Sequence, residues 1–289
     1  MRSAGIHPRA GRAALQVLLL ALVVLVIACG TPAEDEGALT GKVVLTGSST
    51  IAPLAAEIGQ RFEAANPGVR VDVQTGGSSR GIADATSGLA DLGMSSRPLK
   101  EEEAAALTSH TLAFDGVAFV VHAANPVESL TDEQLLGIYT GMIQNWSEVG
   151  GNPGPITVVH RAAGRSEVAL VTAYFGIEPE AIQADLISGE NQHAIKTVAG
   201  DPAAIVYVSV GAAQRAADEG QSLKLLSLRG IPTSVEAVAS GDYPLARPLI
   251  LLTSRKEPLS PAAQAFLDFA LSPDNDDLIA SLAYVPPPR

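Results

Sequence analysis

Strand-like and helix-like segments alternate along this chain from residue 42 onward. The β-branched run at residues 42–46 is followed by a helix-like segment at 53–66, where Pro53 suits the first turn, and the alternating run at 69–74 is followed by another at 82–87. Strands that alternate with helices are typical of α/β folds with mostly parallel sheets, whose ligands bind at the carboxyl ends of the strands.

The same alternation continues to the end of the chain. The other predicted strands are residues 91–95, 111–122 (two apolar runs around Asp115 and Gly116), 156–160, 204–208, 223–228 and 249–253. The other predicted helices are 131–139, which opens with a capping box at Thr131, and 167–175, 210–219 and 260–270.

Four clusters rich in glycine, hydroxyl and arginine residues lie at the ends of predicted strands. They are GSST at 47–50, GGSSRG at 76–81, SSR at 95–97 and RAAGRS at 161–166. Glycine loops let backbone N–H groups approach a ligand, hydroxyls add donors, and helix N-termini contribute partial positive charge. Any one cluster is explained equally well as a helix cap or a turn. Their recurrence at successive strand ends indicates a binding site for a small oxyanion.

The first 28 residues have the pattern of an export signal. They contain three arginines at positions 2, 9 and 12 and no acidic residue. An apolar run at 13–28 follows, which only Gln16 interrupts and which is short for a membrane span. It ends in VIAC at 26–29, which resembles a bacterial lipobox, so Cys29 would carry a lipid and become the mature N-terminus. An ordinary cleavage site or an uncleaved anchor is the alternative. Residues 29–41 then read as a flexible tether.

The composition limits both the compartment and the partners. Cys29 is the only cysteine, so no disulfide forms within one chain and the fold depends on its core. Loss of residues 1–28 removes three of 19 basic residues and none of the acidic ones, which leaves 16 basic against 31 acidic residues. A chain with this excess of negative charge is a poor candidate for binding nucleic acid or anionic membrane surfaces. An anion site must then rely on local dipoles and a few arginines.

Two kinds of catalytic site find no support in the sequence. The histidines beyond the signal lie at positions 110, 122, 160 and 193 without the spacing of metal ligands. The serines of the glycine-rich clusters also have no locally recognisable base, so a hydrolase built on Ser49 or Ser78 finds no support.

Longer stretches resemble the phosphate-binding protein of Pst-type ABC importers. They are LTGSSTIAP at 45–53, GGSSRG at 76–81, ADLGMSSRPL at 90–99, YTGMIQNWSEVGG at 139–151, HRAAGRS at 160–166, KTVAGDPAAIVYVSV at 196–210 and ALSPDNDDLIASLAYVPP at 270–287. The resemblance implies an α/β, two-lobed periplasmic-binding-protein fold of type II, with mixed sheets flanked by helices. It places two hinge crossings near residues 117–122 and 247–253. Lobe 1 would then comprise 41–118 with 250–289, and lobe 2 would comprise 119–249.

The resemblance also implies which residues bind phosphate. Thr50 stands at the position of the family's helix-opening threonine, Ile51 offers a backbone N–H, and Ser78 matches the serine of the second loop. Arg161 matches the anion-binding arginine of lobe 2, whose guanidinium can bind two oxygens in parallel. The full predicted phosphate-binding set is Ser49, Thr50, Ile51, Ser78, Ser96, Arg161, Gly164, Arg165, Ser166 and Glu167.

Two positions depart from the family's pattern. Ser96 stands where an acidic residue is frequent, and a carboxylate accepts a hydrogen bond only from an oxyanion that keeps a proton, as monohydrogen phosphate does and sulfate does not. Residues 165–167 replace Ser-Gly-Thr. One hypothesis is that Glu167 takes over the acceptor role, with Arg165 or Arg97 balancing its charge. The alternative is that Glu167 only complements the helix dipole and pairs with Arg165 on the surface.

The resemblance predicts a protein that captures inorganic phosphate and delivers it to the permease and ATPase subunits of an ABC importer. We expect a monomer without enzymatic activity or cofactor, anchored outside the cytoplasm through its N-terminal lipid. One alternative is a receptor for sulfate, molybdate or tungstate. A second is a surface phosphate sensor or adhesion lipoprotein without a transport role, and a third is a phosphatase.

Overall fold

The structure is a computed structural model that describes Met1 and residues 39–288. The predicted signal sequence, the lipidation site at Cys29 and most of the tether lie outside the described residues. Leu39–Arg289 form one compact unit. In the described part of the chain, no helix has the length and apolar character needed to cross a membrane.

The predicted alternation of strands and helices is present in the structure. The strands are β1 (Gly41–Gly47), β2 (Val69–Thr75), β3 (Leu92–Ser95), β4 (Leu107–His122), β5 (Ser129–Leu130), β6 (Thr157–Arg161), β7 (Leu186–Ser188), β8 (Ala204–Ser209), β9 (Leu223–Leu225), β10 (Ser227–Leu228) and β11 (Ala246–Ser254). The helices are α2 (Ala52–Ala65), α3 (Ser78–Ser87), α4 (Glu101–Ala104), α5 (Asp132–Tyr139), α6 (Ser166–Phe175), α7 (Asn191–Gly200), α8 (Val210–Asp218), α9 (Val235–Ser240), α10 (Pro261–Ala270) and α11 (Asp276–Ser281).

The strands form one mixed sheet in the order β2-β1-β3-β11-β4-β8-β6-β7, with β9 paired to β4, and β10 and β5 pair separately. The outer strands pair in parallel, β1 with β2 and β3, and β6 with β7 and β8. The central strands β11 and β4 are antiparallel to each other and to their outer neighbours β3 and β8. The sheet is therefore more mixed than alternation alone suggests, as the resemblance predicted.

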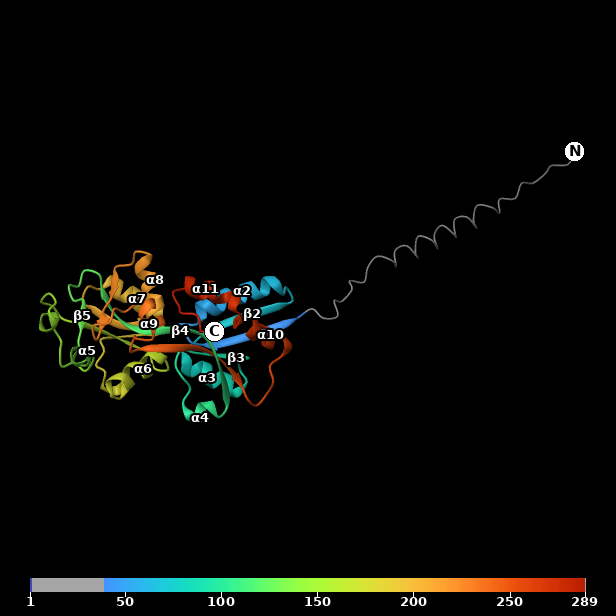
Figure 1. The fold of residues 1–289 in the computed structure, drawn as a ribbon, viewed down its shortest axis with the longest axis horizontal. Helices are drawn as coiled ribbons and strands as arrows, with labels where there is room; N and C mark the ends of the chain where they lie inside the picture. Colours follow the sequence, from blue (N-terminus) through green and yellow to red (C-terminus); the bar gives the residue numbers. More distant parts are fainter. Residues whose placement is uncertain (2–38, 289) are drawn as a thin grey trace. The chain divides into compact units, whose positions relative to one another are not determined.

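Strand β4 runs through both halves of the sheet. Its residues 107–116 pair with β11, and its residues 117–122 pair with β8 and β9. The change of partner between Gly116 and Val117 divides the sheet into two parts, and Figure 1 shows β4 and β11 running between the two groups of helices.

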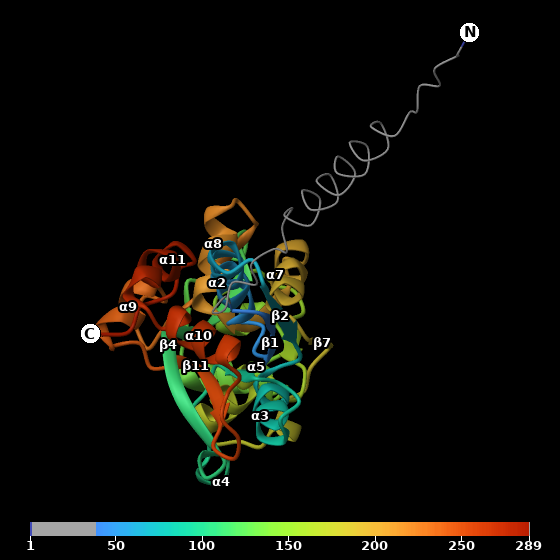
Figure 2. The same ribbon diagram turned by 90° about the vertical axis from the view of Figure 1, so that its right-hand side faces the viewer.

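Each half of the sheet has its own hydrophobic core. The first core packs Leu45, Ile58 and Phe266 around β1, α2 and α10. The second core packs Phe119 and Val206 around β4 and β8. Helices α2, α10 and α11 lie on one face of the first half, and α3 and α4 lie on the other (Figures 1 and 2). Two cores joined by long central strands confirm the predicted two-lobed α/β fold.

Local sequence signals account for some element boundaries and miss others. The predicted capping box is present, because the backbone N–H of Gln134 donates to Thr131 Oγ1 at 3.2 Å and Gln134 Oε1 accepts from the N–H of Thr131 at 2.9 Å. Helix α7 is an unpredicted element, since only Ala194, Ile195 and Val198 give its ten residues an apolar buried face. Helix α3 begins at Ser78, four residues before the predicted start.

Candidate anion-binding site

Three loops of the first core bring their hydroxyl groups together at the carboxyl ends of β1, β2 and β3. Ser48 Oγ donates to Ser96 Oγ at 2.9 Å and accepts from the N–H of Thr50 at 3.2 Å. Ser78 Oγ accepts from the N–H of Ser96 at 3.1 Å. All four residues are buried. Successive strand ends thus converge at one place, as expected for a sheet with parallel outer strands.

The second core adds residues from the first turn of α6. Ser166 Oγ lies 2.6 Å from Ser96 Oγ. Thr50 Oγ1 donates to Glu167 Oε1 at 3.3 Å. We call Ser48, Thr50, Ser78, Ser96 and Ser166 the hydroxyl cluster. Four of its members follow strands β1, β2 and β3, and the fifth, Ser166, opens helix α6.

Backbone atoms of the two cores also touch beside this cluster. Gly77 has a φ of 92°, and a Cβ placed on it would lie 2.7 Å from the carbonyl oxygen of Gly164. The same Gly164 oxygen accepts a hydrogen bond from the N–H of Ser79 at 3.2 Å. Only glycine allows both the left-handed conformation and the close approach at position 77.

Arg161 lies at the end of β6, is fully buried and reaches the cluster through Asn191. Its Nη1 donates to the carbonyl of Glu190 at 2.9 Å, and its Nη2 donates to the carbonyl of Gly189 and to Asn191 Oδ1, both at 3.1 Å. Asn191 Nδ2 donates in turn to Thr50 Oγ1 at 3.1 Å. Arg161 Nε has no hydrogen-bond partner among the described residues.

The two arginines predicted to balance Glu167 have other partners. Arg165 pairs with Glu190 at 2.9 Å, and Arg97 pairs with Glu103 at 2.7 Å. The prediction that either one balances Glu167 is wrong. The alternative, a surface pair of Glu167 and Arg165, is also wrong, because Glu167 is only 2% exposed. Arg165 is the residue before α6, where the backbone is extended, so its side chain diverges from the side chains of the helix.

The actual partner of Glu167 is Arg247, which is absent from the predicted set. Arg247 Nη2 lies 3.0 Å from Glu167 Oε1 and 2.9 Å from Asp115 Oδ2. Its Nη1 donates to Ser166 Oγ at 2.8 Å, and its Nη2 donates to Thr50 Oγ1 at 3.2 Å. Arg247 and Asp115 stand directly opposite each other on β11 and β4, where opposite charges stabilise strand pairing.

Two more residues at the site differ from the prediction. Ser48, and not its predicted neighbour Ser49, joins the hydroxyl cluster. The N–H of Ile51 donates to Ser48 Oγ at 3.4 Å, while the Ile51 side chain lies in the first core. A sequence signal for Arg247 and Asp115 exists, since each is a charge within an apolar strand run, and a charge in a buried strand requires a partner.

The charges around Glu167 keep it ionised. Burial opposes ionisation and would raise the pKa of Glu167, but the guanidiniums of Arg247 and Arg161 outweigh burial and lower that pKa to about 2. At neutral pH this side chain is a carboxylate that can only accept hydrogen bonds. Arg161 and Arg247 balance the charges of Glu167 and Asp115.

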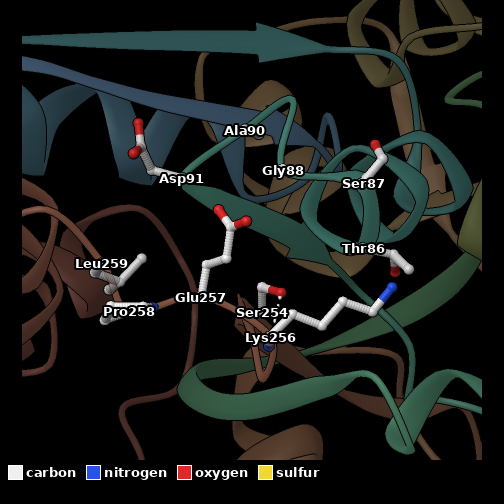
Figure 3. Close-up of a pocket in the computed structure, with 10 residues that line it drawn as sticks. All are labelled: Thr86, Ser87, Gly88, Ala90, Asp91, Ser254, Lys256, Glu257, Pro258 and Leu259. Atoms are coloured by element: carbon white, nitrogen blue, oxygen red, sulfur yellow. Dashed lines mark hydrogen bonds between the residues drawn. The ribbon is translucent and has the colours of Figure 1, made fainter.

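A separate cavity lies at the opposite end of β3. It has a volume of about 240 Å³, and its lining includes Asp91, Lys256 and Glu257, drawn in Figure 3. Asp91 precedes β3 whereas Ser96 follows it, so the five residue steps between them span roughly 17 Å at about 3.3 Å per residue. None of the residues that line this cavity belongs to the hydroxyl cluster.

Comparison with known proteins agrees with this geometry. Residues 32–274 match the family model described as a PBP superfamily domain. The chain therefore belongs to the PBP superfamily.

Individual relatives point in the same direction. The phosphate-binding protein PstS of Bacillus subtilis (strain 168) is 28% identical, with 94% of this chain and 93% of that protein covered. The chain is also similar to a putative phosphate ABC transporter substrate-binding protein from Clostridium perfringens, which was solved with bound phosphate. The two are 31% identical with a TM-score of 0.79, and the match covers 86% of this chain and 100% of the Clostridium perfringens chain. An ABC-type phosphate transport receptor from Vibrio cholerae is also 31% identical, with a TM-score of 0.69, 85% of this chain covered and 100% of that one. The resemblance found in the sequence is confirmed.

Proposed function

We propose that this protein captures inorganic phosphate between its two cores and delivers it to an ABC importer. One observation carries the proposal. Arg161 Nε and both Nε and Nη1 of Arg165 are buried without a hydrogen-bond partner among the described residues. Arg161 is linked to Thr50 of the hydroxyl cluster through Asn191, and Arg165 directly precedes Ser166 of that cluster. An unpaired buried donor costs about 1–3 kcal/mol. A tetrahedral oxyanion supplies the acceptors that these donors lack.

The hydroxyl cluster suits such a ligand because hydroxyl groups rotate. In the structure Ser96 Oγ is within hydrogen-bond distance of Ser48 and Ser166, and each hydroxyl can turn to donate to a phosphate oxygen instead. Removing a dianion from water is costly, so nearly every oxygen lone pair requires a donor. The predicted phosphate-binding residues other than Glu167, with Ser48 and Asn191 added, would supply these donors.

We further propose that Glu167 accepts the proton of monohydrogen phosphate. The carboxylate is ionised, buried and hydrogen-bonded to Thr50. Arg247 pairs with this carboxylate and balances its charge, and Asp115 holds Arg247 through a second ion pair. Sulfate carries no proton at neutral pH and would face this carboxylate without a compensating hydrogen bond, so the site discriminates against it.

Capture and release follow from the two-lobed fold. We place the hinge where β4 changes partner and β11 begins, with the lobe boundaries that the resemblance implies. Opening would separate the loops at 47–50 and 76–81 from the loop at 161–167, and closure would bury the ion among donors. No covalent step or cofactor enters this mechanism, and the protein acts as a receptor rather than an enzyme.

The proposal includes a location and partners. A lipid on Cys29 would hold the monomeric protein outside the cytoplasm, within reach of the permease, while the ATPase drives release. Two relatives, the Clostridium perfringens and Vibrio cholerae proteins, are described as parts of ABC phosphate transport systems.

Thermal unfolding with a panel of oxyanions tests the ligand. A ligand that binds only the folded protein stabilises it by about 2.7 kcal/mol at a concentration of 100 Kd. We expect phosphate to raise the melting temperature strongly, and sulfate, molybdate and tungstate to leave it near its starting value. A larger shift with any of the other three would assign the site to that anion.

A further inference from the structure

The C-terminal segment Leu282–Val285, which we call the C-terminal strap, lies against both cores. Tyr284 belongs to the first core, and Val285 packs against the second. Phe114 and Val285 exchange backbone hydrogen bonds of 2.7 and 2.9 Å. The strap is therefore bonded to β4 two residues before the point where that strand changes partner.

The side chain of Tyr284 connects the strap to Thr50 of the hydroxyl cluster. The hydroxyl of Tyr284 donates to the carbonyl oxygen of Thr50 at 2.7 Å, and Tyr284 is 1% exposed. Burial raises the pKa of Tyr284 to about 12, so its hydroxyl remains a donor at physiological pH. Thr50 precedes α2, and its side chain receives hydrogen bonds from Arg247 and Asn191. Tyr284 thus holds the backbone of a residue whose hydroxyl lies in the cluster.

The other side of the strap rests on α8 of the second core. Arg215 donates from Nη1 to the carbonyl of Leu282, and its guanidinium lies 5.4 Å from the centre of the Tyr284 ring. A Cβ on Gly211 would lie 2.4 Å from the Ala283 oxygen, so the helix and the strap are in close backbone contact.

Helix α8 reaches Thr50 by a second route as well. The N–H of Gly211 donates to Asp115 Oδ1 at 3.1 Å, and Asp115 pairs with Arg247. Arg247 donates to the hydroxyl of Thr50 at 3.2 Å. The carbonyl and the hydroxyl of one threonine are thus each connected to the same helix of the opposite core.

We propose that Tyr284 is a positioning residue for the anion site, which sets the placement of Thr50 and couples it through the C-terminal strap to helix α8. The inference rests on the proposed capture of phosphate. Without the Tyr284 hydroxyl the Thr50 carbonyl loses its buried donor, and the threonine shifts relative to the other hydroxyls. The expected consequence is weaker binding, although Tyr284 does not touch the ligand.

Isothermal titration with phosphate of the Tyr284→Phe variant tests the inference, with Tyr243→Phe as a matched control. Tyr243 is also buried and also donates to a backbone carbonyl, that of Val117, at 2.7 Å, but its hydrogen bonds within the described residues do not reach the hydroxyl cluster. We expect both variants to unfold at lower temperature and only Tyr284→Phe to weaken phosphate binding, by about tenfold, the equivalent of one hydrogen bond.

A double-mutant cycle separates positioning from general loosening. In a Thr50→Val background the threonine hydroxyl is gone, so Tyr284→Phe should cause little further loss of affinity. Arg215→Gln, which removes the contacts of the guanidinium with the Leu282 carbonyl and the Tyr284 ring but keeps the Tyr284 hydroxyl, should weaken phosphate binding in the same direction.

Three results would overturn the inference. The first is an unchanged Kd for phosphate in Tyr284→Phe, and the second is a loss of affinity from Tyr284→Phe that is as large in the Thr50→Val background as in the wild type. The third is an equal loss of affinity in Tyr243→Phe. If the wild-type protein itself binds no phosphate, the proposed function fails and the inference fails with it. Normal wild-type binding beside an unaffected Tyr284→Phe variant would overturn the inference alone.

Discussion

Arg247 and Glu167 form a buried ion pair between strand β11 and helix α6, with 3.0 Å between Nη2 and Oε1. Arg247 lies on a central strand and Glu167 in the first turn of a flanking helix, and each side chain is less than 4% exposed. A buried charge that loses its partner is strongly destabilising. The arrangement of charge around Glu167 therefore depends on helix α6 lying against strand β11.

Replacement of Glu167 by Gln should reduce the selectivity of the site. The amide can donate to an oxygen that carries no proton, so phosphate loses an acceptor and sulfate gains a donor. We expect the ratio of phosphate to sulfate affinity to fall at least tenfold, or about 1.4 kcal/mol, in isothermal titrations with both anions. Glu103→Gln is the control, because Glu103 pairs with Arg97 outside the hydroxyl cluster. If affinity for phosphate and rejection of sulfate both persist in Glu167→Gln, the acceptor lies elsewhere.

Replacement of Arg161 by Ala should abolish useful phosphate binding. The guanidinium orders the backbone at 189–190 and Asn191, and its Nε is unpaired. Hydrogen bonds to charged groups contribute about 1.5–3 kcal/mol each, so a loss of at least a hundredfold is expected by titration. Arg80→Ala is the matched control, since Arg80 lies in the second glycine cluster but bonds outward to Asp84. Micromolar or tighter binding in Arg161→Ala would mean that the site is misplaced.

Replacement of Ser78 by Ala should weaken phosphate binding by about 1–3 kcal/mol if its hydroxyl bonds a charged oxygen. Ser78 is 1% exposed and bonded to the backbone of Ser96, whereas its neighbour Ser79 is exposed. The same titration should show an unchanged Kd for Ser79→Ala. Equal effects of the two substitutions would contradict a specific role for the Ser78 hydroxyl.

Replacement of Gly77 by Ala should impair closure of the two cores. The new methyl group would meet the Gly164 oxygen and force the two loops apart. Gly88 has a comparable positive φ of 74°, but a Cβ there meets nothing within 4 Å. Both variants should lose about 1 kcal/mol of stability through backbone strain, and only Gly77→Ala should bind phosphate more weakly. Denaturant unfolding and titration of the two proteins measure these effects side by side.

Acid should destabilise the protein between about pH 4.5 and pH 2. The pKa of Glu167 falls from an ordinary value of 4.5 to about 2 on folding. The contribution of the ionised Glu167 to the free energy of unfolding is therefore present above pH 4.5 and is lost as the pH falls toward 2. Its size is on the order of 3 kcal/mol. Unfolding free energies measured across this range should fall less steeply in Glu167→Gln. Parallel curves for the two proteins would show that Glu167 does not carry this dependence.

Short-range patterns in the sequence determined much of the fold. The alternation of strands and helices, the capping box at Thr131 and the glycine-rich turns involve residues a few positions apart, and their physics is local. Parallel pairing of successive strands then brings Thr50, Ser78 and Ser96 to one edge of the sheet. The family resemblance, read from the same loops, added Arg161 and the residues at 164–167.

Only the tertiary structure decided the electrostatics of the site. Glu167 pairs with Arg247, eighty residues away in the sequence, and not with nearby Arg165 or with Arg97. Asn191 comes from a helix with little apolar signal, and Ser48 replaces Ser49 because the turn after β1 directs the former inward. The partner of a buried charge depends on which distant strands the hydrophobic cores bring together, and no local pattern encodes that choice.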